Sequence, residues 1–375
     1  MTAVVRFLPR IIMLLTLLVA LLGGMGSGLA RLGVHINQQS LDWIHVHGPL
    51  MICGFLGTLI CLERAVALAV RYRWSMIIPV VNTVGTVMLL FAPDDRLPRG
   101  FLTLGSLGLL LLFGVMLWLH PSRDVAIMAA GTLCWVFGNA LWFSGYPIYQ
   151  VVHLWAAFLI LTIIGERLEL SRVQRLTRTS VRLLVAAVAV YLAGVLITVF
   201  NLDLGVPLLG LGAILMALWL LRYDVARRTI RQSGVPRYIA ACLLLGYGWL
   251  GFGGLAALWT GAIFAGPNYE LVLHAFLLGF VFSMIFGHSL IILPALTGLQ
   301  MRYSPVLYVH LALLHVTLVY RIYGDIIGDL SVRQRGGTLN AITILLFLAV
   351  TLITVIRSNV GRGADERLPA SSVSP

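Results

Sequence analysis

Long apolar runs separated by short polar stretches recur along the whole chain of 375 residues. A helix needs roughly 20 such residues to cross a hydrocarbon core of ~30 Å, because it rises about 1.5 Å per residue. The sequence therefore predicts an all-α, polytopic membrane bundle of about twelve transmembrane helices. The predicted spans are residues 11–30, 46–69, 75–92, 100–119, 125–143, 148–166, 183–200, 205–221, 238–264, 270–296, 305–323 and 338–356.

Short connections between the spans predict a single transmembrane domain over residues 1–356, followed by a disordered cytoplasmic tail over 357–375. The second, sixth and tenth spans each carry a histidine near one end and a polar residue about four turns further in. This spacing by four suggests three repeats of four helices, covering 1–120, 121–234 and 235–356. Chance likeness among apolar helices would give the same pattern, so both interpretations stay open.

Composition and charge narrow the class of protein. Hydrophobic residues make up 60% of the chain and charged residues 11%, which excludes a soluble globular domain. The net charge of +12 comes from arginine alone, and the arginines alternate between loops, which indicates contact with the lipid bilayer rather than with nucleic acid. The predicted spans put 20 of the 26 arginines on one side, so the positive-inside rule predicts cytoplasmic N- and C-termini.

The first 30 residues allow two interpretations. Arg6 and Arg10 ahead of an apolar stretch are typical of a signal peptide, but the stretch continues past Gly23 to Leu29 without a clear cleavage site. We therefore expect a retained first helix. Cleavage would leave the orientation of the other spans unchanged.

Histidines inside the spans are the most informative feature. An ionisable side chain within the bilayer costs about 2–3 kcal/mol, so it normally faces the bundle interior and has a partner. Three histidines on three different spans fall at one predicted depth: His47, His153 and His274. Seven of the nine histidines lie in or at the mouth of a span, namely His45, His47, His153, His274, His288, His310 and His315.

Two histidines from opposite helices at one depth could bind haem b, because neutral imidazole is an axial ligand of haem iron. His47 and His274 are the best pair. His153 would then be a ligand to a second metal, or a partner of the residues that hold the haem. His45 and His47 could bind copper if their segment is extended, because alternate residues then point the same way. Each histidine taken singly could instead form a hydrogen bond between helices.

A second polar set lies deeper in the predicted bundle. His288 and His310 fall at nearly one depth and could form a second metal site. Together with His315, Glu63 and Glu166 they could instead line a proton path. Two simpler interpretations are buried histidines bonded to neighbouring helices, and ion pairs between each glutamate and an arginine at the helix ends.

Three charged residues, Arg321, Asp325 and Asp329, lie at the outer end of the eleventh span. They could hold haem propionates, or they could be ordinary loop charges.

Two segments resemble a known family. Trp43–His47 followed by Gly54 and Phe55 resembles the opening of the second helix in the NnrS family, and His274–Gly279 resembles a late helix of that family. The likeness is that of a divergent member. NnrS proteins are multi-spanning bacterial haem- and copper-containing membrane proteins linked to nitric oxide metabolism and nitrosative stress. The resemblance implies a haem and copper protein of the bacterial inner membrane, with nitric oxide as partner. The sequence has no soluble redox domain and no c-type haem attachment motif, so electrons would come from quinol or a separate protein.

Subunit I of the haem-copper oxidases is also similar in architecture, with twelve helices in three arcs. Its second and tenth helices carry the low-spin haem ligands, and the matching positions here are His47 and His274. The seventh span, 183–200, contains no histidine, so the copper triad of those oxidases is incomplete and we do not expect oxygen reduction.

The sequence thus favours a haem-binding membrane protein, with copper as a further candidate metal, that acts in nitric oxide metabolism or electron transfer. If it is an enzyme, it is an oxidoreductase. The alternative, from another class, is a histidine-lined channel or secondary transporter without a metal cofactor.

Overall fold

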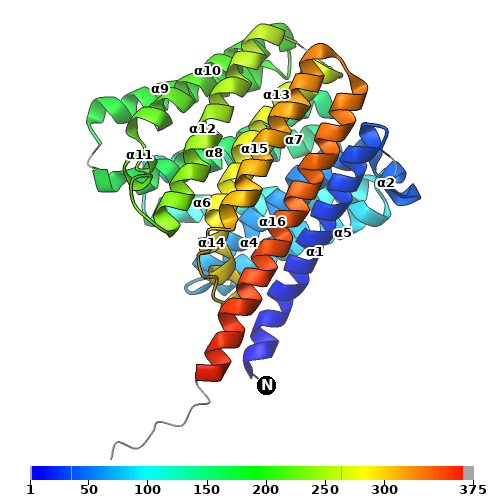
Figure 1. Cartoon of the computed structure of the whole chain (residues 1–375). Coiled ribbons are helices and arrows are strands. Elements are labelled where there is room, and N and C mark those ends of the chain that lie inside the picture. The colour runs from blue at the N-terminus through cyan, green and yellow to red at the C-terminus, as the bar shows by residue number, and fades with distance from the viewer. Residues whose placement is uncertain (1, 35, 175, 263, 366–375) are drawn as a thin grey trace, which may run out of the picture.

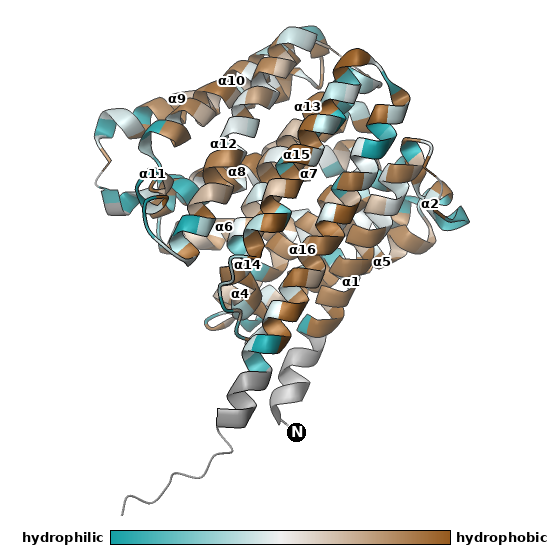
Figure 2. Cartoon of the chain, in the orientation of Figure 1, coloured by the Kyte–Doolittle hydropathy of each residue, from teal (hydrophilic) through white to brown (hydrophobic). Residues whose placement is uncertain are grey.

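The computed structural model describes residues 2–34, 36–174, 176–262 and 264–365 (Figure 1). Within these ranges every regular element is helical, and twelve helices are long and apolar enough to cross a membrane. Figure 2 shows the long helices as largely hydrophobic, with hydrophilic residues gathered toward helix ends and loops. The chain is therefore a multi-pass membrane protein, and the prediction of a twelve-helix bundle is confirmed.

Most spans are single helices, whereas the second, third and tenth are composite. The single-helix spans are α1 (Thr2–Arg31), α6 (Arg96–Leu119), α7 (Arg123–Phe143), α8 (Ile148–Leu170), α9 (Arg178–Ile197), α10 (Leu202–Tyr223), α12 (Val235–Thr260), α15 (Leu307–Ile327) and α16 (Leu330–Asp365). The composite spans are η1 (Ile44–Val46) to α3 (His47–Pro49), η2 (Leu50–Gly57) and α4 (Thr58–Ala69); η3 (Arg73–Met76) to α5 (Ile77–Phe91); and α13 (Pro267–His274) to η5 (Ala275–Val281) and α14 (Phe282–Thr297). Short helices α2 (Gln38–Asp42), η4 (Ser171–Gln174) and α11 (Ala226–Thr229) lie between spans.

Helix ends follow local capping chemistry. Side-chain oxygens of Asp95 and Asn201 accept backbone N–H groups in the first turns of α6 and α10, at 3.2 and 3.1 Å. These bonds satisfy donors that a helix leaves free at its start. Helices α14 and α15 end at Gly298 and Gly328, whose φ angles of 72° and 70° strongly favour glycine. Capping therefore sets where α6 and α10 begin and where α14 and α15 end.

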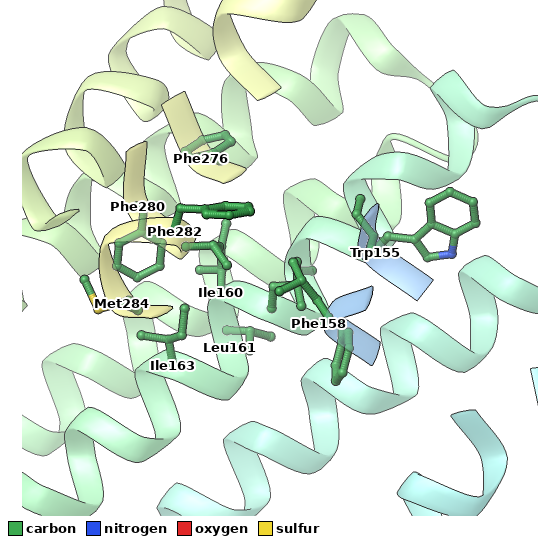
Figure 3. Packing of buried hydrophobic residues seen from close by; sticks show 14 of the residues in the cluster. Trp155, Phe158, Ile160, Leu161, Ile163, Phe276, Phe280, Phe282 and Met284 are labelled. Carbon is green, nitrogen blue, oxygen red and sulfur yellow. The ribbon is translucent and has the colours of Figure 1, made fainter. Parts of the chain in front are cut away.

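Three helices form the centre of the bundle. The second, sixth and tenth spans have the largest buried shares, at 61%, 83% and 67%. Figure 3 shows Phe280 and Phe282 of the tenth span beside Ile160 and Ile163 of α8. The central helices are thus the three that carry the histidines predicted at one depth. This accords with the three-repeat arrangement, which stays a prediction.

The first and last spans lie side by side. Helices α1 and α16 are in contact, and their free ends lie at the same end of the molecule (Figure 1). Helix α16 continues to Asp365, so the first part of the tail predicted over 357–375 is helical. The rest of that predicted tail lies outside the described residues.

Wide π-helical turns interrupt two of the three central helices. Segment η2 begins at Leu50, shortly after His47, and η5 begins at Ala275, directly after His274. The third central helix, α8, is α-helical throughout. Such turns are rare and frequently occur at functional sites. Hydrophobic periodicity did not predict them, because both segments are almost uniformly apolar.

Candidate functional site

A cavity of about 400 Å³ lies at the end of the bundle where His47 is found. This volume is within the usual range of roughly 300–1,000 Å³ for small-molecule sites. Its polar lining residues are Arg31, His45, His47, Tyr149, Tyr269, Glu270, His274, Arg321 and Asn340. Its apolar wall includes Met25, Leu29, Met51, Ile52, Val152, Phe264, Leu277, Leu278, Phe282 and Ile344. Six spans contribute to it, the first, second, sixth, tenth, eleventh and twelfth.

His47 and His274 face this cavity from two different central helices. Nδ1 of His47 lies 2.6 Å from the carbonyl oxygen of Gly24, and Nδ1 of His274 lies 2.7 Å from that of Glu270. A ring nitrogen that faces a carbonyl oxygen must carry the proton, so Nε2 of each neutral ring keeps its lone pair. No described residue forms a hydrogen bond with either Nε2 atom. Both rings therefore offer an unprotonated nitrogen to a ligand in the cavity.

Two glycines of α1 make room for side chains of the second span, His47 among them. A Cβ atom at Gly28 would lie 2.7 Å from Cε1 of His47, and one at Gly24 would lie 2.5 Å from the Met51 sulfur. The two glycines are four residues apart, so they share one face of α1. Our reading of the sequence missed this role of α1. The small-x-x-x-small spacing was the available signal, since it marks close approach of membrane helices.

Arginines give the rim of the cavity a positive charge. Arg31 and Arg321 both line the cavity. Arg321 is buried, and its guanidinium lies 3.2 Å from the Glu270 carboxylate, which also lies 3.2 Å from Arg333. Arg333 also pairs with Asp325, so these two arginines face two carboxylates, while Arg31 has no described carboxylate partner. Sequence analysis did not single out Arg31.

The acidic residues at the outer end of the eleventh span face other partners. Asp325 pairs with Arg333 at 2.7 Å. The Asp329 carboxylate accepts N–H groups in the first turn of α16, above all that of Val332, and these bonds lower the pKa of Asp329. Of the three residues predicted to hold propionates, only Arg321 lines the cavity.

His153 lies behind the cavity wall rather than in the cavity. It is buried on α8 and lines a separate void of about 10 Å³, close to the volume needed for one water molecule. Tyr269 and Leu273 line both spaces and separate them. Nε2 of His153 has no hydrogen-bond partner among the described residues. Equal depth along the helix therefore did not put His153 beside His47 and His274.

His45 does not form the extended pair predicted for copper. Residues Ile44–Val46 form a helical turn, so the condition for His45 and His47 to point the same way is not met. Nε2 of His45 lies 2.9 Å from the Asp94 carboxylate in a solvent-exposed ion pair.

The deeper histidines are bonded to neighbouring groups. His310 lies 3.1 Å from the Tyr238 hydroxyl, His315 accepts the Trp249 indole N–H at 2.8 Å, and Nδ1 of His288 faces a carbonyl one turn earlier on its own helix. Among the residues that the structure describes, no group of three or more His, Cys, Asp or Glu is placed to hold a metal ion. The structure thus lends no support to the second metal site at His288 and His310.

Comparison with known proteins places the chain in a family. A family model described as a domain of unknown function, DUF8744, matches residues 10–356. The chain belongs to the DUF8744 family. No curated protein and no solved structure matches it. The matched DUF8744 region includes all six spans around the cavity.

At the opposite end of the DUF8744 bundle, ion pairs join two central helices to each other and one of them to the end of α10. Glu166 of α8 pairs with Arg64 of α4, and Glu63 lies 4.0 Å from the same arginine. The next residue, Arg167, forms a buried pair with Asp224 at 2.9 Å. Both glutamates predicted to line a proton path therefore lie next to an arginine, and that path stays a prediction.

Proposed function

We propose that this chain binds haem b in the cavity, with His47 and His274 as the two axial ligands. One observation carries the proposal. Two histidines on separate central helices line one cavity, each with Nδ1 held by a backbone carbonyl and Nε2 free. A hydrogen bond of this kind fixes the tautomer and the ring orientation of a metal-binding histidine.

The rest of the cavity suits the same group. Its wall is mainly apolar, as a macrocycle requires, and Met51 and Leu277 belong to that wall. Arg31 and Arg321 at the rim could bind carboxylates such as the two propionates, because guanidinium groups form strong hydrogen bonds with carboxylates. Bound haem would supply one-electron chemistry.

The proposed pair of haem ligands, His47 and His274, helps to choose between reaction classes. If both His47 and His274 hold the haem, its chemistry would be electron transfer, with quinol or another protein as partner. A role in nitric oxide or nitrosative-stress metabolism in the bacterial inner membrane rests on the resemblance to NnrS proteins. Cytoplasmic positions for both termini rest on the distribution of arginines. If the chain turns over a substrate, it would act as an oxidoreductase. Copper is left out of the proposal because His45 pairs with Asp94.

The optical spectrum of the detergent-purified protein tests the proposal. The oxidised and dithionite-reduced forms are recorded with and without nitric oxide, and iron and copper are measured in the same sample. A sharp reduced b-type spectrum with iron and without copper is expected. A change on adding nitric oxide would favour gas binding, whereas an unchanged spectrum would favour electron transfer. A colourless protein without iron would overturn the proposal and favour a histidine-lined channel or transporter.

Replacing Gly28 with alanine is expected to reduce haem content without unfolding the protein. The added methyl group would overlap the His47 ring, so the ring must move from its place beside the cavity. Gly114 of α6 is the matched control, because a Cβ there would meet no atom within 4 Å. Haem per protein is measured for Gly28→Ala and Gly114→Ala. Equal haem content in the two variants would contradict the assigned position of His47.

A further inference from the structure

A second cavity, of about 480 Å³, lies at the other end of the bundle. It is bounded by η4, the start of α9, the end of α10 and α11. Successive spans run in opposite directions, so the start of the seventh span and the end of the eighth lie opposite the His47 end. Four lining residues, which we term the cavity arginines, are Arg222, Arg227, Arg228 and Arg231.

The cavity arginines lack the acidic partners that other arginines at this end have. Arg167 pairs with Asp224, and Arg172 pairs with Asp124. Within the described part of the chain, no carboxylate lies within ion-pair distance of any of the four cavity arginines. Asp224 also lines the cavity, but Arg167 already balances its charge. The cavity therefore carries an excess of positive charge that the described chain does not neutralise.

Neutral donors in the same cavity also suit an anion. The side-chain Nε2 of Gln174 is buried and has no hydrogen-bond partner among the described residues, and Gln174 lines the cavity. Helix α9 begins just after Thr177, which also lines it, so the positive end of the helix dipole lies at the cavity. A buried amide without a partner is costly, and a bound oxygen acceptor would satisfy it. The positive charge and the free hydrogen-bond donors thus both indicate an anionic ligand with acceptor oxygens.

We infer that this cavity binds a phosphate group, either the headgroup of an anionic phospholipid or a soluble phosphate compound. A phosphate offers several strong acceptor oxygens to guanidinium groups. The position at the end of two membrane helices favours the lipid, because basic pockets between such helices bind anionic headgroups. This site is separate from the haem cavity, so either assignment can fail without the other.

The test measures thermal unfolding of the full-length, delipidated protein in detergent. The added probes are phosphatidylglycerol, phosphatidylcholine and inorganic phosphate. The variant carries Arg222→Gln, Arg228→Gln and Arg231→Gln together, and leaves Arg227, which donates to the Arg222 carbonyl at 3.0 Å. We expect phosphatidylglycerol to raise the melting temperature of the unmodified protein. In the variant its apparent Kd should weaken roughly 100-fold, about fivefold for each arginine removed.

A matched control carries Arg71→Gln, Arg73→Gln and Arg123→Gln, three exposed arginines at the same end outside the cavity. It should keep the full response to phosphatidylglycerol. A response to inorganic phosphate of equal size would support the site and assign it to a soluble ligand. Loss of the response in both triple variants, its retention in both, or an equal response to phosphatidylcholine would overturn the inference. If the cavity variant does not fold, Arg228→Gln alone is compared with Arg71→Gln by the same criteria.

Discussion

Replacing either His47 or His274 with alanine is expected to abolish the haem spectrum. Each substitution removes an imidazole from the cavity lining; of the other two nearby histidines, His45 already contacts Asp94 and His153 lies behind Tyr269 and Leu273. Loss of a ligand should reduce retained haem by at least about tenfold, since even the groups that support metal ligands contribute tenfold or more to affinity. Haem per protein after purification is the measurement, together with the reduced spectrum.

His120→Ala is the matched control, because His120 lies exposed in the loop after α6. It should keep the spectrum of the unmodified protein. Both cavity variants must still elute as a single folded species in size-exclusion chromatography, which separates a lost ligand from a lost fold. If His47→Ala and His274→Ala retain as much haem as His120→Ala, the axial ligands are wrongly assigned.

Breaking the ion pair between Arg167 and Asp224 is expected to have the largest effect on stability. Both side chains are buried, with 2% and 0% exposed, and two hydrogen bonds of 2.9 and 3.1 Å join them. Arg167→Met would leave the Asp224 carboxylate buried with a single described donor, the Ala226 N–H. Removing one partner of a buried pair typically costs about 3–5 kcal/mol. The melting temperature in detergent should fall by roughly 4–6 °C.

Two comparisons test this explanation. Asp94→Ala breaks the exposed pair with His45 and should change stability by less than about 1 kcal/mol. Adding Asp224→Asn to Arg167→Met removes the uncompensated charge, so the double variant should recover part of the lost stability. A fall in Arg167→Met no larger than in Asp94→Ala would show that the buried pair is not important for stability.

The number and rough limits of the spans were predictable because the bilayer restricts the choices. A chain in hydrocarbon must satisfy its backbone within each helix, so span length and apolar composition identify it. The depth of His47 and His274 was also predictable, because helical rise converts position along the chain into depth. The interruptions by η2 and η5 were not, since π-helical and α-helical turns place similar demands on a uniformly apolar sequence.

The sequence did not determine in which direction each histidine side chain points around its helix axis. His153 has the expected position along α8, yet it faces a small void behind Tyr269 instead of the cavity. His45 lies two residues from His47, yet a helical turn directs it to Asp94. Rotation about each helix depends on how neighbouring helices pack, and apolar residues on every face of these spans leave that packing undetermined.

The sequence by itself determined the class of protein and its twelve spans, because both follow from composition and helical rise. Only the tertiary structure decided which of the histidines in those spans share a cavity, because that depends on contacts between spans far apart in the chain. It brought Gly24 and Gly28 of the first span against the second, and Arg321 of the eleventh beside Glu270 of the tenth. Such contacts depend on side-chain shape at helix interfaces, which no local pattern records.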